Sequence, residues 1–114
     1  MPQNDKTAAA LRLVGLAARA RRTVGGIELI ATALSRGAKD KTPLVILEAS
    51  DSSANTHKRI NDRAFFYGVP IFRLPIDGGR LALAIGKRDG NVMAVGITEP
   101  NLAREITAIL TQNN

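Results

Sequence analysis

Arginines and glycines gather in one short segment that could hold an anion. Residues 19–28 contain three arginines followed by a pair of glycines: Arg19, Arg21, Arg22, Gly25 and Gly26. We expect a helix to begin at the glycines, because an apolar stripe at helical spacing starts there. The first turn of a helix offers unpaired N–H groups and the positive end of its dipole, and glycine lets an anion approach. The alternative is a simple tight turn with solvated arginines.

A second basic pair, Lys87-Arg88, lies in a predicted turn between Gly86 and Gly90. If the fold places this turn beside the paired glycines, the two segments would clamp one edge of a duplex; otherwise it is a solvated loop. The chain carries 16 Lys and Arg against 10 Asp and Glu, a net charge of +6. Most of that excess falls in residues 1–39, which include Lys39. Such an asymmetric basic charge favours a polyanionic partner, above all a nucleic acid.

Catalysis and metal binding are not indicated by the residues present. Ser50, Asp51 and His57 are close in sequence, but a loop and a first helical turn do not arrange them as nucleophile, base and orienting group. We expect His57 to be a packed or rim residue instead. There is no cysteine, only one histidine, and neither a GxGxxG nor a P-loop motif. We therefore expect no enzyme activity, no metal and no cofactor.

Strands that alternate with helices predict the fold. Extended runs at 21–24, 44–47, 69–74 and 92–97 predict strands, the second and third of them buried. Periodic apolar residues predict helices from Thr7, over 26–36 and 53–67, from Asp77 and from Pro100. The result is an α/β protein, a three-layer α/β/α sandwich with a four-stranded mixed sheet, in a single domain over residues 7–112.

The same patterns limit the partners and the location. Phe65, Phe66 and Phe72 are expected inside, with Tyr67 on the inner side of its helix, which argues against stacking of single-stranded bases on the surface. No run approaches the roughly 18 apolar residues of a membrane span, and the N-terminal residues lack the apolar region typical of a signal peptide. We expect a cytoplasmic monomer in which only the chain tips, Met1–Lys6 and Asn113-Asn114, are disordered.

Several motifs in order resemble a known family. They are Leu-Val-Gly-Leu-Ala-Ala-Arg-Ala at 13–20, Gly26-Ile-Glu-Leu with Arg36-Gly37, Val45-Ile-Leu-Glu48, Asn55-Thr56 with Lys58, Tyr67-Gly-Val-Pro-Ile71, and Leu81 with Ile85-Gly86-Lys87. Together they resemble the kink-turn-binding ribosomal protein superfamily, which includes archaeal large-subunit ribosomal protein seven-Ae and its thirty-e relatives. Within it the chain is most similar to bacterial YlxQ-type RNA-binding proteins. The resemblance implies an α/β/α sandwich that binds sharply bent RNA with sheared G·A pairs.

The resemblance also implies where RNA is held. In the family, RNA contacts the start of the second helix and the loop before the last strand, here Gly25–Leu29 with Thr32, and Lys87–Asp89. The ribosomal members carry an Asn-Glu pair and a following Lys where this chain has Glu28, Leu29 and Thr32.

We expect Glu28 and Thr32 to read base edges, and the basic residues and glycines to contact the RNA backbone. Leu29 is expected to point outward, where it either packs on a base or ribose or is simply an exposed leucine, the commoner case. The backbone contacts are Arg19, Arg21, Arg22, Gly25, Gly26, Lys39, Lys87 and Arg88. The expected partner is structured RNA, either kink-turn-like or ribosomal. Two alternatives remain, a protein-interaction module of the translation or transcription machinery and a small nucleotide-binding α/β domain.

Overall fold

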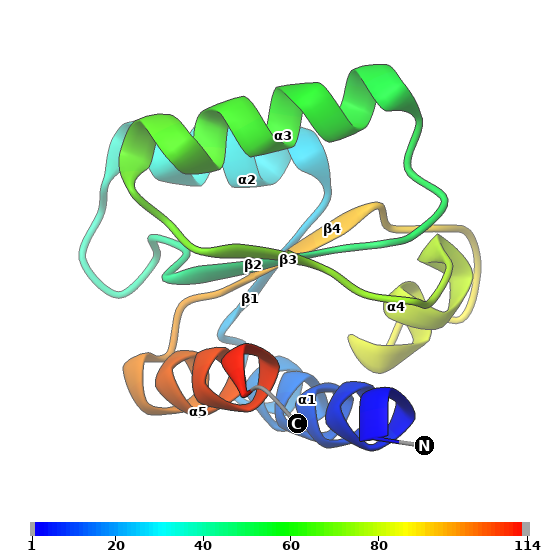
Figure 1. The fold of residues 1–114 in the computed structure, drawn as a ribbon. Coiled ribbons are helices and arrows are strands. Elements are labelled where there is room, and N and C mark those ends of the chain that lie inside the picture. Colours follow the sequence, from blue (N-terminus) through cyan, green and yellow to red (C-terminus); the bar gives the residue numbers. More distant parts are fainter. Residues whose placement is uncertain (1, 113–114) are drawn as a thin grey trace.

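Helices and strands alternate along the chain in the computed structural model, which describes residues 2–112 (Figure 1). The helices are α1 (Pro2–Arg19), α2 (Ile27–Arg36), α3 (Ala54–Tyr67), α4 (Gly78–Ala84) and α5 (Pro100–Thr111). The strands are β1 (Thr23–Gly25), β2 (Val45–Glu48), β3 (Ile71–Arg73) and β4 (Ala94–Ile97). The predicted order of elements is confirmed.

The four strands form one mixed sheet in the order β1-β4-β2-β3. Strand β4 pairs antiparallel with both neighbours, so that Gly96 lies opposite Val24 on one side and Ile46 on the other. Strands β2 and β3 are parallel, with Leu47 opposite Phe72. Strands β1, β2 and β3 consequently run in the same direction, and β4 is inserted between the first two of them.

Helices cover both faces of this sheet, as a three-layer sandwich requires. Helices α2 and α3 lie on one face and α1 and α5 on the other, with α4 beside α1 (Figure 1). Each face has its own aliphatic cluster, because alternate residues of a strand point to opposite sides. Ile46 packs with Ile30 and Ile60 beneath α2 and α3, whereas Leu47 packs with Val14 on the α1 side.

Local sequence signals set the helix ends. Ser53 caps α3 by accepting a hydrogen bond from the backbone N–H of Thr56 at 3.1 Å, and Asp77 caps α4 in the same way. Gly37 and Gly68 end α2 and α3 in the left-handed conformation. These ends agree with the predicted ones.

Two expectations about the chain course are wrong. Residues 2–6 are not a disordered tip but the first turns of α1, where proline is tolerated because its missing N–H would be unpaired in any case. The tips Met1 and Asn113-Asn114 lie outside the described residues. Strand β3 is not a buried central strand: it is an edge of the sheet, with Ile71 and Phe72 half-buried and Arg73 exposed.

The aromatic side chains also differ from expectation. Phe65 and Phe66 are 90% and 78% exposed, and Tyr67 is exposed to a smaller extent. Phe72 is half-buried. The inner stripe of α3 is occupied by Ile60 and Ala64. Positions 65 and 66 lie about 100° and 200° farther round the helix and so point away from the sheet.

Candidate functional site

The paired glycines and the basic turn meet at one edge of the sheet. Strand β1 ends at Gly25 on the edge where β4 begins, because these two strands are antiparallel. A Cβ atom added to Gly25 would lie 2.9 Å from Cδ1 of Ile85 and 3.9 Å from Cγ1 of Val92, the residues that flank the turn at 86–91. The backbone N–H of Gly26 donates to the carbonyl of Ala94 at 2.9 Å. The structure therefore brings together two segments that the sequence could only suggest were neighbours.

The start of α2, here called the helix start (residues 25–29), carries free backbone donors. Gly26 is the N-cap residue, with φ 103° and ψ 148°, and no side chain caps this helix. The first helical hydrogen bond runs from the N–H of Ile30 to the carbonyl of Gly26 at 3.0 Å. The N–H groups of residues 27–29 precede it and have no acceptor within the helix. They supply the donors and the positive dipole end that an anion requires.

We expect Gly26→Ala to lower the free energy of unfolding by about 1–3 kcal/mol, because the backbone conformation of Gly26 is almost closed to residues with a Cβ. Space is not the reason, since no atom lies within 4 Å of the added carbon. Urea denaturation measures the change. Gly15→Ala within α1 is the matched control and should stabilise slightly. Equal stability of Gly26→Ala and the unaltered protein would contradict the requirement for glycine.

The basic turn, defined as residues 86–91, presents two free cations. Lys87 and Arg88 are exposed, and neither forms an ion pair with any described residue. Gly86 and Gly90 adopt positive φ values of 83° and 86°, which bend the chain at both ends of the turn. The backbone of Lys87 is anchored, since its N–H donates to the carbonyl of Ala82 at 2.9 Å. The charges are thus held at the edge without being neutralised.

The three arginines before the helix start have different surroundings. Arg19 is exposed and, with Gly86, lines a depression of about 280 Å³, which places it next to the basic turn. Arg21 is exposed and has a positive φ of 60°. Arg22 is half-buried and donates to the hydroxyl and carbonyl oxygens of Thr98 at 3.1 and 2.7 Å. Arg22 therefore ties β1 to the end of β4, and its contact with RNA stays a prediction.

The expected base-reading residues lie on the outer side of α2. Leu29 is 62% exposed, which confirms its outward orientation, and Thr32 is exposed as well. Glu28 accepts a hydrogen bond from Arg59 of α3 at 2.8 Å. That hydrogen bond and the charge of Arg59, with a smaller effect of Arg63, hold the pKa of Glu28 below its usual value. Sequence reasoning missed both α3 arginines, because nothing local connects α3 with α2.

An open cavity of about 490 Å³ adjoins the helix start. Four predicted residues line it, namely Arg21, Gly25, Leu29 and Thr32. Arg36 and Lys41 add cations that were not predicted, and the loop containing Lys39 forms the far end. Lys39 itself is exposed but is not among the lining residues. The cavity therefore runs along the side of α2 next to β1, with cations and one acid, Asp40, in its lining.

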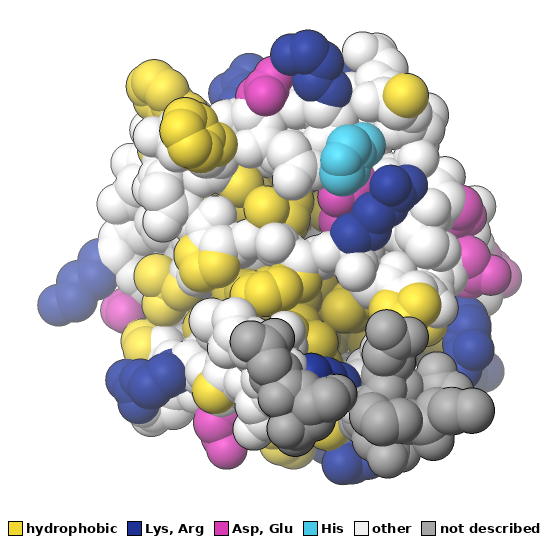
Figure 2. All heavy atoms as spheres, viewed as in Figure 1, with side chains coloured by type: hydrophobic (Ala, Val, Ile, Leu, Met, Phe, Trp, Pro, Cys, Tyr) yellow, Lys and Arg dark blue, Asp and Glu magenta, His cyan; other side chains and the backbone are white. Residues whose placement is uncertain are grey.

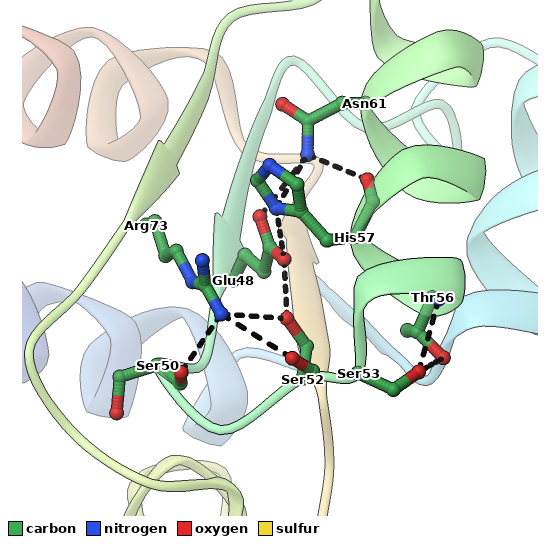
Figure 3. Close-up of polar contacts among 8 residues, drawn as sticks. All are labelled: Glu48, Ser50, Ser52, Ser53, Thr56, His57, Asn61 and Arg73. Atoms are coloured by element: carbon green, nitrogen blue, oxygen red, sulfur yellow. Dashed lines mark hydrogen bonds and ion pairs between the residues drawn. The ribbon is translucent and has the colours of Figure 1, made fainter.

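The one histidine belongs to a buried polar network at the end of β2 (Figure 3). Glu48 is 1% exposed, and one carboxylate oxygen accepts hydrogen bonds from Ser52 and from Nδ1 of His57 at 2.7 Å. The other oxygen accepts from Asn61 at 3.1 Å. Burial raises the pKa of Glu48, but these hydrogen bonds outweigh it and leave the pKa below its usual value. The sequence did not indicate this network, because β2 was expected to be aliphatic.

Ser50, Asp51 and His57, which are close in sequence, each bond to a different partner. His57 is half-buried at the rim and bonded to Glu48, as expected for a structural histidine. Ser50 donates its hydroxyl to the carbonyl of Ile76, and Asp51 accepts from the backbone of Gly78. Among residues 6–112, whose side chains the structure describes, no group of three or more His, Cys, Asp or Glu side chains could hold a metal ion. Over the same residues no helix is long and apolar enough to cross a bilayer.

Comparison with known proteins identifies the family. No protein-family model matches the chain. RNA-binding protein YlxQ of Bacillus subtilis (strain 168) is 34% identical over 98 residues, which cover 86% of this chain and 91% of that protein. The chain belongs to the YlxQ family. A second YlxQ protein, the RNA-binding protein of Enterococcus faecium, is 38% identical over 65 residues, 57% of this chain and 59% of its own. The resemblance to YlxQ-type proteins is thereby confirmed.

Solved structures share the fold of this YlxQ-family chain. A protein with unknown function from Bacillus halodurans C has a TM-score of 0.78 and 27% identity, covering 90% of this chain and 97% of its own. The 15.5kD RNA binding protein of Giardia lamblia has a TM-score of 0.73 and 16% identity, covering 91% and 86%. At such low identity the second likeness shows the fold alone. Membership of the kink-turn-binding ribosomal superfamily stays a prediction.

Proposed function

We propose that the protein is a non-catalytic, cytoplasmic, monomeric RNA-binding protein that recognises structured RNA, kink-turn-like or ribosomal, with one edge of its sheet. The observation that carries this proposal is the meeting of the helix start with the basic turn. The helix start supplies N–H groups without an acceptor in the helix, and the turn supplies Lys87 and Arg88, which form no ion pair with described residues. The YlxQ relatives, which are named RNA-binding proteins, support it.

Backbone contacts supply most of the affinity in this proposal. Lys87 and Arg88 belong to the turn beside the helix start, whereas Arg21 precedes β1 and so lies toward the other end of that short strand. In this proposal the phosphates of one bent duplex contact cations of both segments. The N–H groups of the helix start bind a further phosphate. Glu28 carries a carboxylate at neutral pH and can accept a hydrogen bond from the amino group of guanine or cytosine. Specificity thus comes from few groups and from the shape of the RNA.

The dependence of affinity on salt tests the proposal directly. If about four to six phosphates are neutralised, a plot of log K against log salt should fall with a slope of roughly −3 to −5. Fluorescence anisotropy with a labelled kink-turn hairpin and with a perfect duplex of the same length provides the measurement. A flat salt response, or binding to neither RNA, would overturn the proposal. Equal affinity for the hairpin and the duplex would agree with RNA binding but would contradict a preference for bent RNA.

The cavity beside the helix start favours one other function, the binding of a small nucleotide. Its volume of about 490 Å³ and its excess of lining cations, Arg21, Arg36 and Lys41 against the single acid Asp40, suit a phosphorylated ligand. Titration with mononucleotides, followed by nuclear magnetic resonance, distinguishes the two. Saturable shifts confined to the cavity, without RNA binding, would favour the nucleotide.

A further inference from the structure

Two adjacent phenylalanines project from the end of α3 into solvent. Phe65 is 90% exposed and Phe66 is 78% exposed, more than any other large apolar side chain that the structure describes. In Figure 2 hydrophobic side chains stand out from the surface where α3 ends. Tyr67 contacts Phe66 edge to face, with ring centroids 4.9 Å apart and planes at 82°, and so restrains that ring. Exposed aromatics of this kind mark a binding surface more often than a lone leucine does.

A basic row connects the helix start with these rings. Arg59, Arg63 and Phe66 are spaced i, i+4 and i+7 and therefore share one face of α3. Arg59 contacts Glu28 at the helix start, and Arg63 is near enough to influence the same carboxylate. Arg63 is exposed and forms no ion pair with any described residue. The row thus begins at the proposed RNA site and ends at an aromatic surface.

The dimensions and charge of this row suit a short nucleic-acid strand. Seven residues of α3 span about 10 Å, which corresponds to about three nucleotides of a stacked strand. Helix α3 carries three cations, Lys58, Arg59 and Arg63, against one acid, Asp62. Cations that follow a backbone and aromatic rings that stack on bases are the two components of sites for single-stranded nucleic acids. Arg59 is already paired with Glu28, but a predominantly apolar partner protein would leave Arg63 without an ion pair among the described residues.

We propose that Arg59, Arg63, Phe65 and Phe66 form a track for a single-stranded RNA segment that continues from the structured RNA at the helix start. The arginines contact its phosphates, and Phe66, on their face of α3, stacks on a base. Phe65 lies about 100° farther round the last turn of α3 and stacks on a base beyond the end of that face. This inference rests on the proposed function, because the strand is taken to leave the same RNA. It also reverses the expectation that aromatic stacking plays no part, which assumed that the phenylalanines were buried.

Three RNAs and one double variant test the track. The probes are a kink-turn hairpin with blunt ends and the same hairpin extended by six unpaired uridines, at either the 5′ or the 3′ end. The unaltered protein should bind one extended hairpin at least about 5-fold more tightly than the blunt one. Phe65→Ala/Phe66→Ala should lose that gain and keep its affinity for the blunt hairpin. Leu44→Ala, which removes an exposed apolar side chain elsewhere, is the control.

The outcomes separate the track from the proposed function. Equal affinity of the unaltered protein for blunt and extended hairpins would overturn the track and leave the function standing. The same holds if the folded double variant binds both RNAs normally, the result expected if these rings meet a protein. If the blunt hairpin is not bound at all, the proposed function fails. Binding of a ten-nucleotide oligouridine, weakened in the double variant, would then still support the track, and its absence would overturn it.

Discussion

The double variant Lys87→Ala/Arg88→Ala is expected to bind structured RNA about 10–100-fold more weakly than the unaltered protein at 0.1 M salt. Both side chains are exposed, unpaired with described residues and held beside the helix start. Each phosphate contact removed should also make the salt slope shallower by about one unit. Anisotropy titrations with one hairpin, at potassium chloride concentrations from about 0.05 to about 0.2 M, give both the affinity and the slope of log K against log salt.

The matched control is Arg12→Ala/Arg104→Ala, which removes the same charge from α1 and α5. Both arginines are exposed on the layer opposite α2 and α3. If net charge alone attracted RNA, the two double variants would lose affinity equally. Such a result would contradict a localised binding edge, even if RNA binding itself were real.

Glu48→Ala is expected to lower the free energy of unfolding by about 2–4 kcal/mol, the second large effect. The substitution leaves the donors of Ser52, His57 and Asn61 without their shared acceptor in a mostly buried site. Urea denaturation measures the loss. Asp62→Ala is the control, because the Asp62–Lys58 pair is solvent-exposed and should contribute little to stability. Similar stabilities of the two variants would show that the network contributes little.

The same carboxylate gives stability a defined dependence on pH. Burial opposes the charged form of Glu48, but hydrogen bonds from Ser52, His57 and Asn61 lower its pKa in the folded protein below the usual 4.5. A lowered pKa stabilises the fold above pH 4.5, and this contribution disappears as pH falls through the folded pKa. The difference in stability between the unaltered protein and Glu48→Gln should therefore narrow below pH 4.5. A constant difference down to pH 2, about two units lower, would contradict this linkage.

Local features of the fold could be predicted because their causes are local. An aliphatic run such as residues 44–47 forms a strand, and a stripe such as Ile30 with Leu34 forms a helix, through the spacing of neighbours along the chain. The caps Ser53 and Asp77 act on N–H groups three residues away. Burial of a whole element is not local. Strand β3 has the composition of a core strand but lies at an edge of the sheet, where it pairs with β2 alone.

The candidate site likewise combines local features that the sequence determines with contacts that only the tertiary structure decides. Sequence alone determined its components, the helix start at Gly25-Gly26 and the free cations Lys87 and Arg88, since backbone donors and charges follow from residue type and helix polarity. Only the tertiary structure decided that they meet, because β4 enters the sheet antiparallel to β1 and places its leading turn at the helix start. Likewise only the packing of α3 decided that Arg59 reaches Glu28 and that Phe65 and Phe66 face solvent. Exposure depends on which face of a helix covers the sheet, a property of the assembled layers.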